Sequence, residues 1–148
     1  FIMPVDEDAR GSFAESIQIF QGLVFIFDGQ IETAKKHFQS LLDKTDNPMS
    51  QTLSQLYLLQ IALLERDHEK AEEYASNRGV KSFLSLKMAD TQIMQAWYQF
   101  LVKKDMNQTD KAIKIARQNM VTSRLVRDEK RYYENWLAEL EKELSEGV

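Results

Sequence analysis

The stretch ESIQIFQGLVFIFDGQIETAKKHFQSLLDK, residues 15–44, decides the fold of this chain. Its second half carries an apolar stripe at the spacing of one helix face: Ile31, Ala34, Phe38, Leu41 and Leu42. Asp28 and Gly29 separate the two halves and are typical of a helix end followed by a turn. The stretch therefore predicts two helices, over residues 12–27 and 31–44, joined by a tight turn.

Outward from this pair, the rest of the chain also has helical periodicity. Ser12, with Glu15 three residues later, has the pattern of a capping box, so residues 1–11 are expected to be an irregular lead. No segment alternates with period two, and only 5 Gly and 2 Pro interrupt 148 residues, so we predict one all-α domain over residues 12–148. Further helices are expected over residues 49–65, 69–78 (ending at Gly79), 82–86, 88–103, 110–120 and 123–145.

Composition excludes several classes of function. The absence of cysteine excludes disulfide frameworks, cysteine zinc sites and thiol catalysis, and it is typical of a reducing compartment, so a cytoplasmic location is predicted. The net charge of −4 argues against binding to nucleic acid. No window of 18 apolar residues exists, so no membrane span is expected in this fragment. The chain starts at Phe1 and not at Met, which indicates a piece of a longer protein or a processed form.

Six residues of the first two helices follow an ordered series of residue types: Gln18, Gln21, Gly22, Phe25, Ala34 and Phe38. This order resembles the signature of the tetratricopeptide repeat, although the two glutamines stand where the family has Trp and Leu. The resemblance implies that Gly22 lets the helices approach closely and that Phe38 seals the pair. Two weaker matches to this pattern lie around Ala71 and Ala112. Counted from Ala34, the three alanines are 37 and 41 residues apart, against a family period of about 34.

The resemblance implies antiparallel helix pairs stacked as a tetratricopeptide-like superhelix, with the last helix as a C-terminal capping helix. The family binds peptides or protein segments in a groove lined by the first helix of each pair. Carried over to this sequence, the groove positions are Ile19, Leu23, Ile26, Phe27, Leu56, Gln60, Leu63, Gln95, Gln99 and Lys103. The implied function is a protein–protein interaction module with a protein or peptide partner.

No residue pattern indicates an enzyme, a metal site or a cofactor. His37 and His68, the two histidines, are expected on an outer helix face and in a turn, where they do not converge with other ligands. Paired carboxylates such as Glu72 and Glu73 lie in charged helical stretches and lack the burial that acid–base catalysis needs. The sequence contains no glycine-rich phosphate loop, no G-x-S-x-G and no H-E-x-x-H. We therefore expect no enzymatic activity and no cofactor.

Two features leave alternatives open. The run from Phe20 to Phe27 holds more apolar side chains than one core face can bury, so it predicts burial between helices, an apolar groove or an oligomer interface. The span from Lys111 to Arg131 carries a net charge of +5, which fits a solvated face or contact with an acidic partner. A homodimer, a structural domain, and an accessory domain of a larger enzyme or signalling protein therefore stand beside peptide binding as alternatives.

Overall fold

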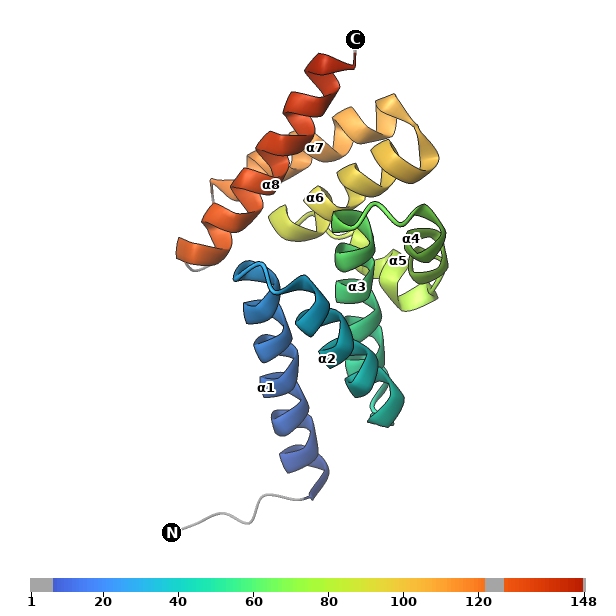
Figure 1. Cartoon of the computed structure of the whole chain (residues 1–148), viewed down its shortest axis with the longest axis vertical. Coiled ribbons are helices and arrows are strands. Elements are labelled where there is room, and N and C mark those ends of the chain that lie inside the picture. Colours follow the sequence, from blue (N-terminus) through green and yellow to red (C-terminus); the bar gives the residue numbers. More distant parts are fainter. Residues whose placement is uncertain (1–6, 122–126, 148) are drawn as a thin grey trace.

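The computed structural model describes residues 7–121 and 127–147 of the chain (Figure 1). Within these residues the chain forms eight α-helices and one π-helical segment and no β-strand, which confirms the predicted all-α class. The elements are α1 (Glu7–Phe27), α2 (Ile31–Lys44), α3 (Pro48–Leu64), α4 (His68–Ala75), α5 (Arg78–Leu84), α6 (Ala89–Tyr98), the π-helical η1 (Gln99–Lys103), α7 (Met106–Met120) and α8 (Arg127–Glu146).

Three helix pairs are joined by the same kind of tight turn. In each turn, a residue just after the first helix has a positive φ angle: Gly29 at 78°, Arg66 at 58° and Lys104 at 54°. The next residue is in each case the N-cap of the following helix: Gln30 before α2, Asp67 before α4 and Asp105 before α7. The turns recur after 37 and 38 residues, so the described chain contains an internal repeat of helix, left-handed residue and helix.

The repeat continues into the second helix of each pair. Four residues after each N-cap lies a small, buried side chain: Ala34, Ala71 and Thr109. The sequence prediction placed the third of these at Ala112, after a loop over residues 105–109, and the structure corrects both points because α7 already begins at Met106. Asp105 starts this helix early, since its carboxylate accepts a hydrogen bond from the backbone amide of Gln108 at 3.0 Å.

We expect Lys104→Gly to stabilise the fold by about 0.5–1 kcal/mol. A side chain in the left-handed region costs roughly 1–2 kcal/mol, whereas the extra freedom of glycine in the unfolded chain costs only about 0.4–1 kcal/mol. Urea denaturation of both proteins measures the difference. As a matched control, Lys111→Gly inside α7 should destabilise the fold by about 1 kcal/mol. A loss of stability in Lys104→Gly would contradict the left-handed turn.

The close approach of α1 and α2 depends on one glycine. The fully buried ring of Phe38 lies against α1 at Gly22, where an added Cβ atom would come within 2.3 Å of the ring atom Cζ. The ring cannot easily retreat, because on another side it packs against Tyr57 of α3, at 5.6 Å between ring centroids. The expected close contact between Gly22 and Phe38 is therefore confirmed.

Helix α3 lies between two groups of buried side chains. Leu58 and Ile61 pack into a smaller core with α1 and α2, whereas Leu59 and Leu63 pack into a larger core with α4 to α8. Asn47 caps the start of this helix, and its side chain accepts hydrogen bonds from two free backbone amides of the first turn, at 2.9 and 3.1 Å. Burial on both sides explains why the sequence of this helix is apolar around most of its circumference.

Helix α8 completes the larger core. Its buried side chains are Tyr133, Trp136, Leu137 and Leu140. The indole of Trp136 stacks on that of Trp97 in α6, with ring centroids 5.8 Å apart, and Trp97 Nε1 donates a hydrogen bond to the Trp136 carbonyl oxygen at 3.1 Å. In Figure 1, α8 crosses α6 and α7, and its first turns lie near the end of α1. Helix α8 is thus a structural part of the core, and the predicted start of this helix at residue 123 lies outside the described residues.

Predicted boundaries near α1, α4 and α5 are also wrong. Helix α1 begins at Glu7, so the irregular lead expected over residues 1–11 does not hold for residues 7–11. A capping pattern marks one place where a helix can start, and no proline in this segment prevents an earlier start. Gly79 does not end α4 but lies in α5, where an added Cβ atom would meet the Thr52 side chain of α3 at 2.7 Å. This glycine permits a close approach of two helices.

Candidate interaction surfaces

Half of the ten predicted groove positions lie in the core. Their side chains are at most 8% exposed: Ile19, Ile26, Leu56, Gln60 and Leu63. They pack against helices of the same chain, so a ligand cannot reach them in this structure. These positions were assigned to a groove because the tetratricopeptide resemblance implies one there, and helical periodicity alone does not distinguish a face that packs in the core from one that lines a groove.

Helix α8 covers the region where the predicted groove passes from α1 to α3. Phe27 is half-buried, and the centroid of its ring lies 5.1 Å from the ring centroid of Tyr132 and 5.9 Å from that of Tyr133. The Tyr133 hydroxyl donates a hydrogen bond to Gln60 Oε1 at 3.1 Å. Two predicted groove residues on different helices therefore contact one helix of this chain. Leu23, one turn before Phe27, is half-buried against the smaller core.

The other three predicted positions lie together at the surface. Gln95, Gln99 and Lys103 line a hollow of about 300 Å³ against α4 and α5. Gln99 Nε2 donates a hydrogen bond to Gln95 Oε1 at 3.3 Å, and Lys103 Nζ pairs with Glu72 Oε1 at 3.0 Å. The hydroxyl of Tyr98 donates a hydrogen bond to the other oxygen of Glu72 at 3.3 Å. The polar side chains that line this hollow already bond with one another, so a ligand would have to replace those bonds.

The outer face of α1 carries a stripe of exposed apolar side chains. Phe13, Ile17, Phe20 and Val24 are 69, 43, 56 and 37% exposed, and we call these four residues the α1 stripe. Their spacing of four, three and four residues places them along one side of the helix, like the contact positions of a coiled coil. An exposed apolar patch of this kind marks an interaction surface in many proteins.

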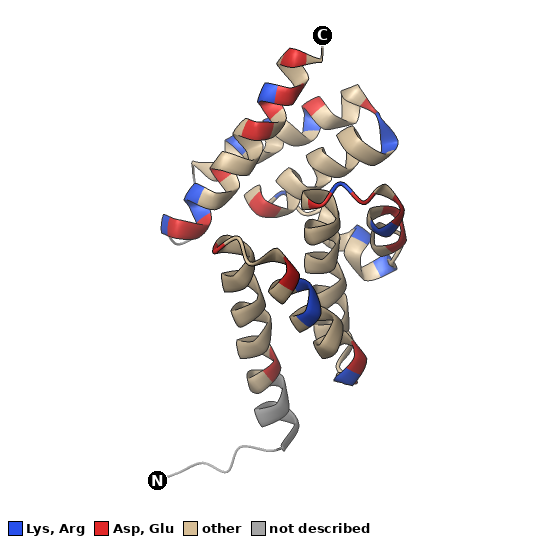
Figure 2. Cartoon of the chain, viewed as in Figure 1, with Lys and Arg blue, Asp and Glu red and all other residues tan. Residues whose placement is uncertain are grey.

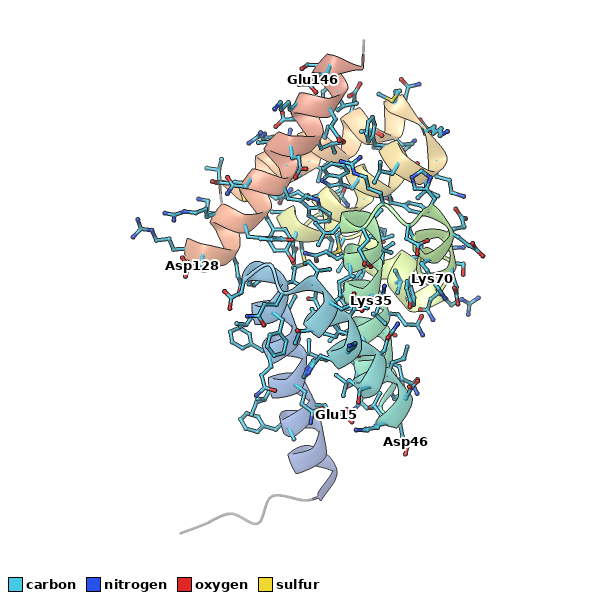
Figure 3. All side chains as sticks on the ribbon, in the orientation of Figure 1. Glu15, Lys35, Asp46, Lys70, Asp128 and Glu146 are labelled. Carbon is cyan, nitrogen blue, oxygen red and sulfur yellow. The ribbon has the colours of Figure 1, made fainter. Side chains whose placement is uncertain are left out.

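The α1 stripe is free of charge along its length. Figure 2 shows a single acidic position on the coloured part of α1, and this is Glu15. Its carboxylate faces away from the stripe, toward the start of α3 (Figure 3), and accepts hydrogen bonds from Thr45 Oγ1 at 2.7 Å and from Ser50 Oγ at 2.6 Å. Together with the buried Ile19 and Ile26, these bonds fix α1 so that the stripe faces solvent.

Sequence reasoning identified only part of this surface. The run from Phe20 to Phe27 divides between the core and the surface: Ile26 is fully buried, Phe27 is half-buried, and Phe20 and Val24 are exposed. The N-terminal half of the stripe was missed. The signal was a second apolar series, spaced by four and three residues from Phe13 onward, because a helix with two apolar series can turn only one of them toward its core.

Two carboxyl groups near the contact of α6 and α8 have raised pKa values. Burial raises the pKa of Asp90, and a hydrogen bond from the backbone amide of Thr91, at 2.9 Å, partly opposes this shift. Loss of water also raises the pKa of Glu129, and the negative charge of Asp90 adds to that rise. Burial first, and then the charge of Asp90, raise the pKa of the neighbouring Tyr57 phenol. Negative charge at Asp90 therefore opposes folding.

We expect Asp90→Asn to stabilise the fold at neutral pH, and the gain to shrink on acidification. A raised carboxyl pKa means that the folded chain binds the proton more tightly than the unfolded chain. The wild type therefore recovers stability as the pH falls through the folded pKa, and loses it as the pH rises. Urea denaturation at about pH 7 and at about pH 4, near the ordinary pKa of an aspartate, measures this difference. Asp110→Asn, an exposed position in α7, is the matched control, and equal gains at all pH values would contradict the prediction.

Among the residues that the structure describes, no three His, Cys, Asp or Glu side chains come together to hold a metal ion. His37 donates a hydrogen bond from Nε2 to the carbonyl oxygen of Gln18 at 2.6 Å, and His68 is exposed at the start of α4. In residues 7–121 and 127–147, no helix is long and apolar enough to cross a membrane.

Comparisons of the chain with protein-family models, with curated protein sequences and with solved structures find no match.

Proposed function

We propose that this chain is a protein-interaction module with a tetratricopeptide-like stack of helix pairs, and that the α1 stripe is its docking surface. The observation that carries the proposal is the stripe itself: four exposed apolar side chains on one side of a helix whose other side is anchored in the core. The recurring turns at Gly29, Arg66 and Lys104 support the stacked arrangement.

The α1 stripe is the more favourable place for docking, because no described helix of this chain packs over its four side chains. The hollow at Gln95, Gln99 and Lys103 is the weaker location, because its polar groups already bond with one another. The α1 stripe has its apolar surface in water, so docking there removes that surface from solvent at no cost in broken hydrogen bonds.

We expect Phe20→Glu to abolish partner binding and Met106→Glu to leave it intact. A glutamate in the middle of an apolar interface must lose water without gaining a partner, which weakens binding by more than about tenfold. Met106, at the start of α7, is 46% exposed against 56% for Phe20, so it controls for the same charge change elsewhere. In a pull-down, the tagged wild type and each tagged variant are compared by the proteins that they retain. Untagged copies of this chain are included among the proteins offered.

Both substituted positions are exposed, so each variant should keep the helical circular dichroism of the wild type. The proposal requires at least one protein that the wild type and Met106→Glu retain and Phe20→Glu loses. Equal retention by all three proteins would place binding away from α1.

A further inference from the structure

We infer that the partner of the α1 stripe is a second copy of this chain, which pairs with the first through α1 in antiparallel orientation. The inference rests on the proposed function of the stripe and adds the identity of the partner. Side-chain size, charge and area each bear on it.

The side chains of the stripe match their own copy when the two helices run in opposite directions. A two-fold axis through the middle of the stripe places Phe13 opposite Val24 of the second copy, and Ile17 opposite Phe20 of the second copy. Each contact then joins an aromatic side chain to a smaller β-branched one, so large residues face small ones on both sides of the axis. In a parallel pair, Phe13 and Phe20 would each meet an identical ring, and Val24 would meet an identical small side chain.

The charge of the surface also fits a second copy. Two copies carry the same net charge of −4, so a surface through which they pair should hold no charge of its own. From Phe13 to Phe27, Glu15 is the one charged residue in the sequence, and it is hydrogen-bonded on the opposite side of the helix. The exposed neighbours of the stripe, Gln18 and Gln21, are neutral. A strongly charged partner would leave its charges unmatched here.

The area of the stripe sets the strength of the pair. From their exposed fractions, the four side chains present roughly 400 Å² per chain, so that a pair would bury roughly 800 Å² of apolar side-chain surface. Stable interfaces bury about 1,200–2,000 Å², and smaller ones belong to weak, transient complexes. The dimer is therefore expected to form and dissociate with concentration.

Sedimentation equilibrium over about 10 µM to about 1 mM tests the pairing. The mass of the wild type should rise from 17.3 kDa toward twice that value, Met106→Glu should follow the same curve, and Phe20→Glu should stay at 17.3 kDa throughout. A wild type that remains monomeric at about 1 mM overturns the inference. The proposed function survives that outcome if Phe20→Glu still loses a different protein in the binding experiment. Dimerisation of Phe20→Glu as strong as that of the wild type would place the interface elsewhere and also overturn the inference.

A distance measurement tests the orientation. The chain has no cysteine, so Asp28→Cys, just after α1, provides a single site for a spin label. In the antiparallel pair, the two labels should lie about 30 Å apart, given 1.5 Å of rise per residue and about 10 Å between helix axes. In a parallel pair they would lie about 10–15 Å apart, and that result would overturn the antiparallel arrangement.

Discussion

Phe38→Ala should lower the free energy of unfolding by about 3–5 kcal/mol, as truncation of a buried phenylalanine commonly does. Phe38 is fully buried between α1, α2 and α3. The cavity left by its ring would open directly beside Gly22, which has no side chain to fill it. The loss is a large fraction of the 5–15 kcal/mol that stabilises a typical domain, so it should be evident in urea denaturation followed by circular dichroism.

Gly22→Ala provides the sharper test, because its effect should change sign with the residue at position 38. Against the Phe38 ring, the added methyl group should cost about 1–3 kcal/mol from overpacking, offset by about 1 kcal/mol of better helix propensity. In the Phe38→Ala background the clash disappears, and Gly22→Ala should stabilise the chain by about 1 kcal/mol. Equal effects of Gly22→Ala in both backgrounds would contradict the contact between the two residues.

Trp136→Ala should cost about 3–5 kcal/mol and loosen α8 from the rest of the domain. Its indole is 4% exposed and stacks on Trp97, and its backbone carbonyl accepts the hydrogen bond from Trp97 Nε1. The chain contains two tryptophans, so the fluorescence of the variant reports on Trp97 alone. We expect the emission of Trp97 to shift to the red, since its ring gains contact with water.

Trp136→Phe is the conservative control for this prediction. It keeps an aromatic ring on Trp97 and should cost clearly less than the alanine variant. If Trp136→Ala costs less than about 1 kcal/mol, the helix does not pack on α6 in solution. In that case the contacts of α8 with Phe27 and Gln60 would also be lost.

The local elements of the fold were predictable because their signals lie within a few residues of each other. The bounds of α2, residues 31–44, follow from a clear apolar stripe between a glycine turn and a polar loop. Gly29 marks the first turn, since glycine is the usual residue at a positive φ. Arg66 and Lys104 take the same conformation without such a signal, and so the register of the third pair was placed three residues late.

The candidate site was less predictable, because it depends on contacts between distant parts of the chain. The hydrogen bond between Gln60 and Tyr133 joins residues that lie 73 positions apart in the sequence. Periodicity assigns both residues to inner faces of helices but does not say that α8 covers the groove side of α3. The same limit applies to the exposed face of α1. The apolar series at Phe20 and Val24 is visible in the sequence, but the sequence does not show that no described helix covers it.

The position of α3 between the two cores bears on how the chain loses its structure. Arrays of helix pairs commonly fray from their ends, since each pair contacts only its neighbours. Here α3 supplies buried side chains to both cores, so unfolding of α3 removes packing contacts from each of them. The contact between Phe27 and Tyr132 also links α1 to α8. We therefore expect the two cores to be thermodynamically coupled and the described part of the chain to unfold cooperatively.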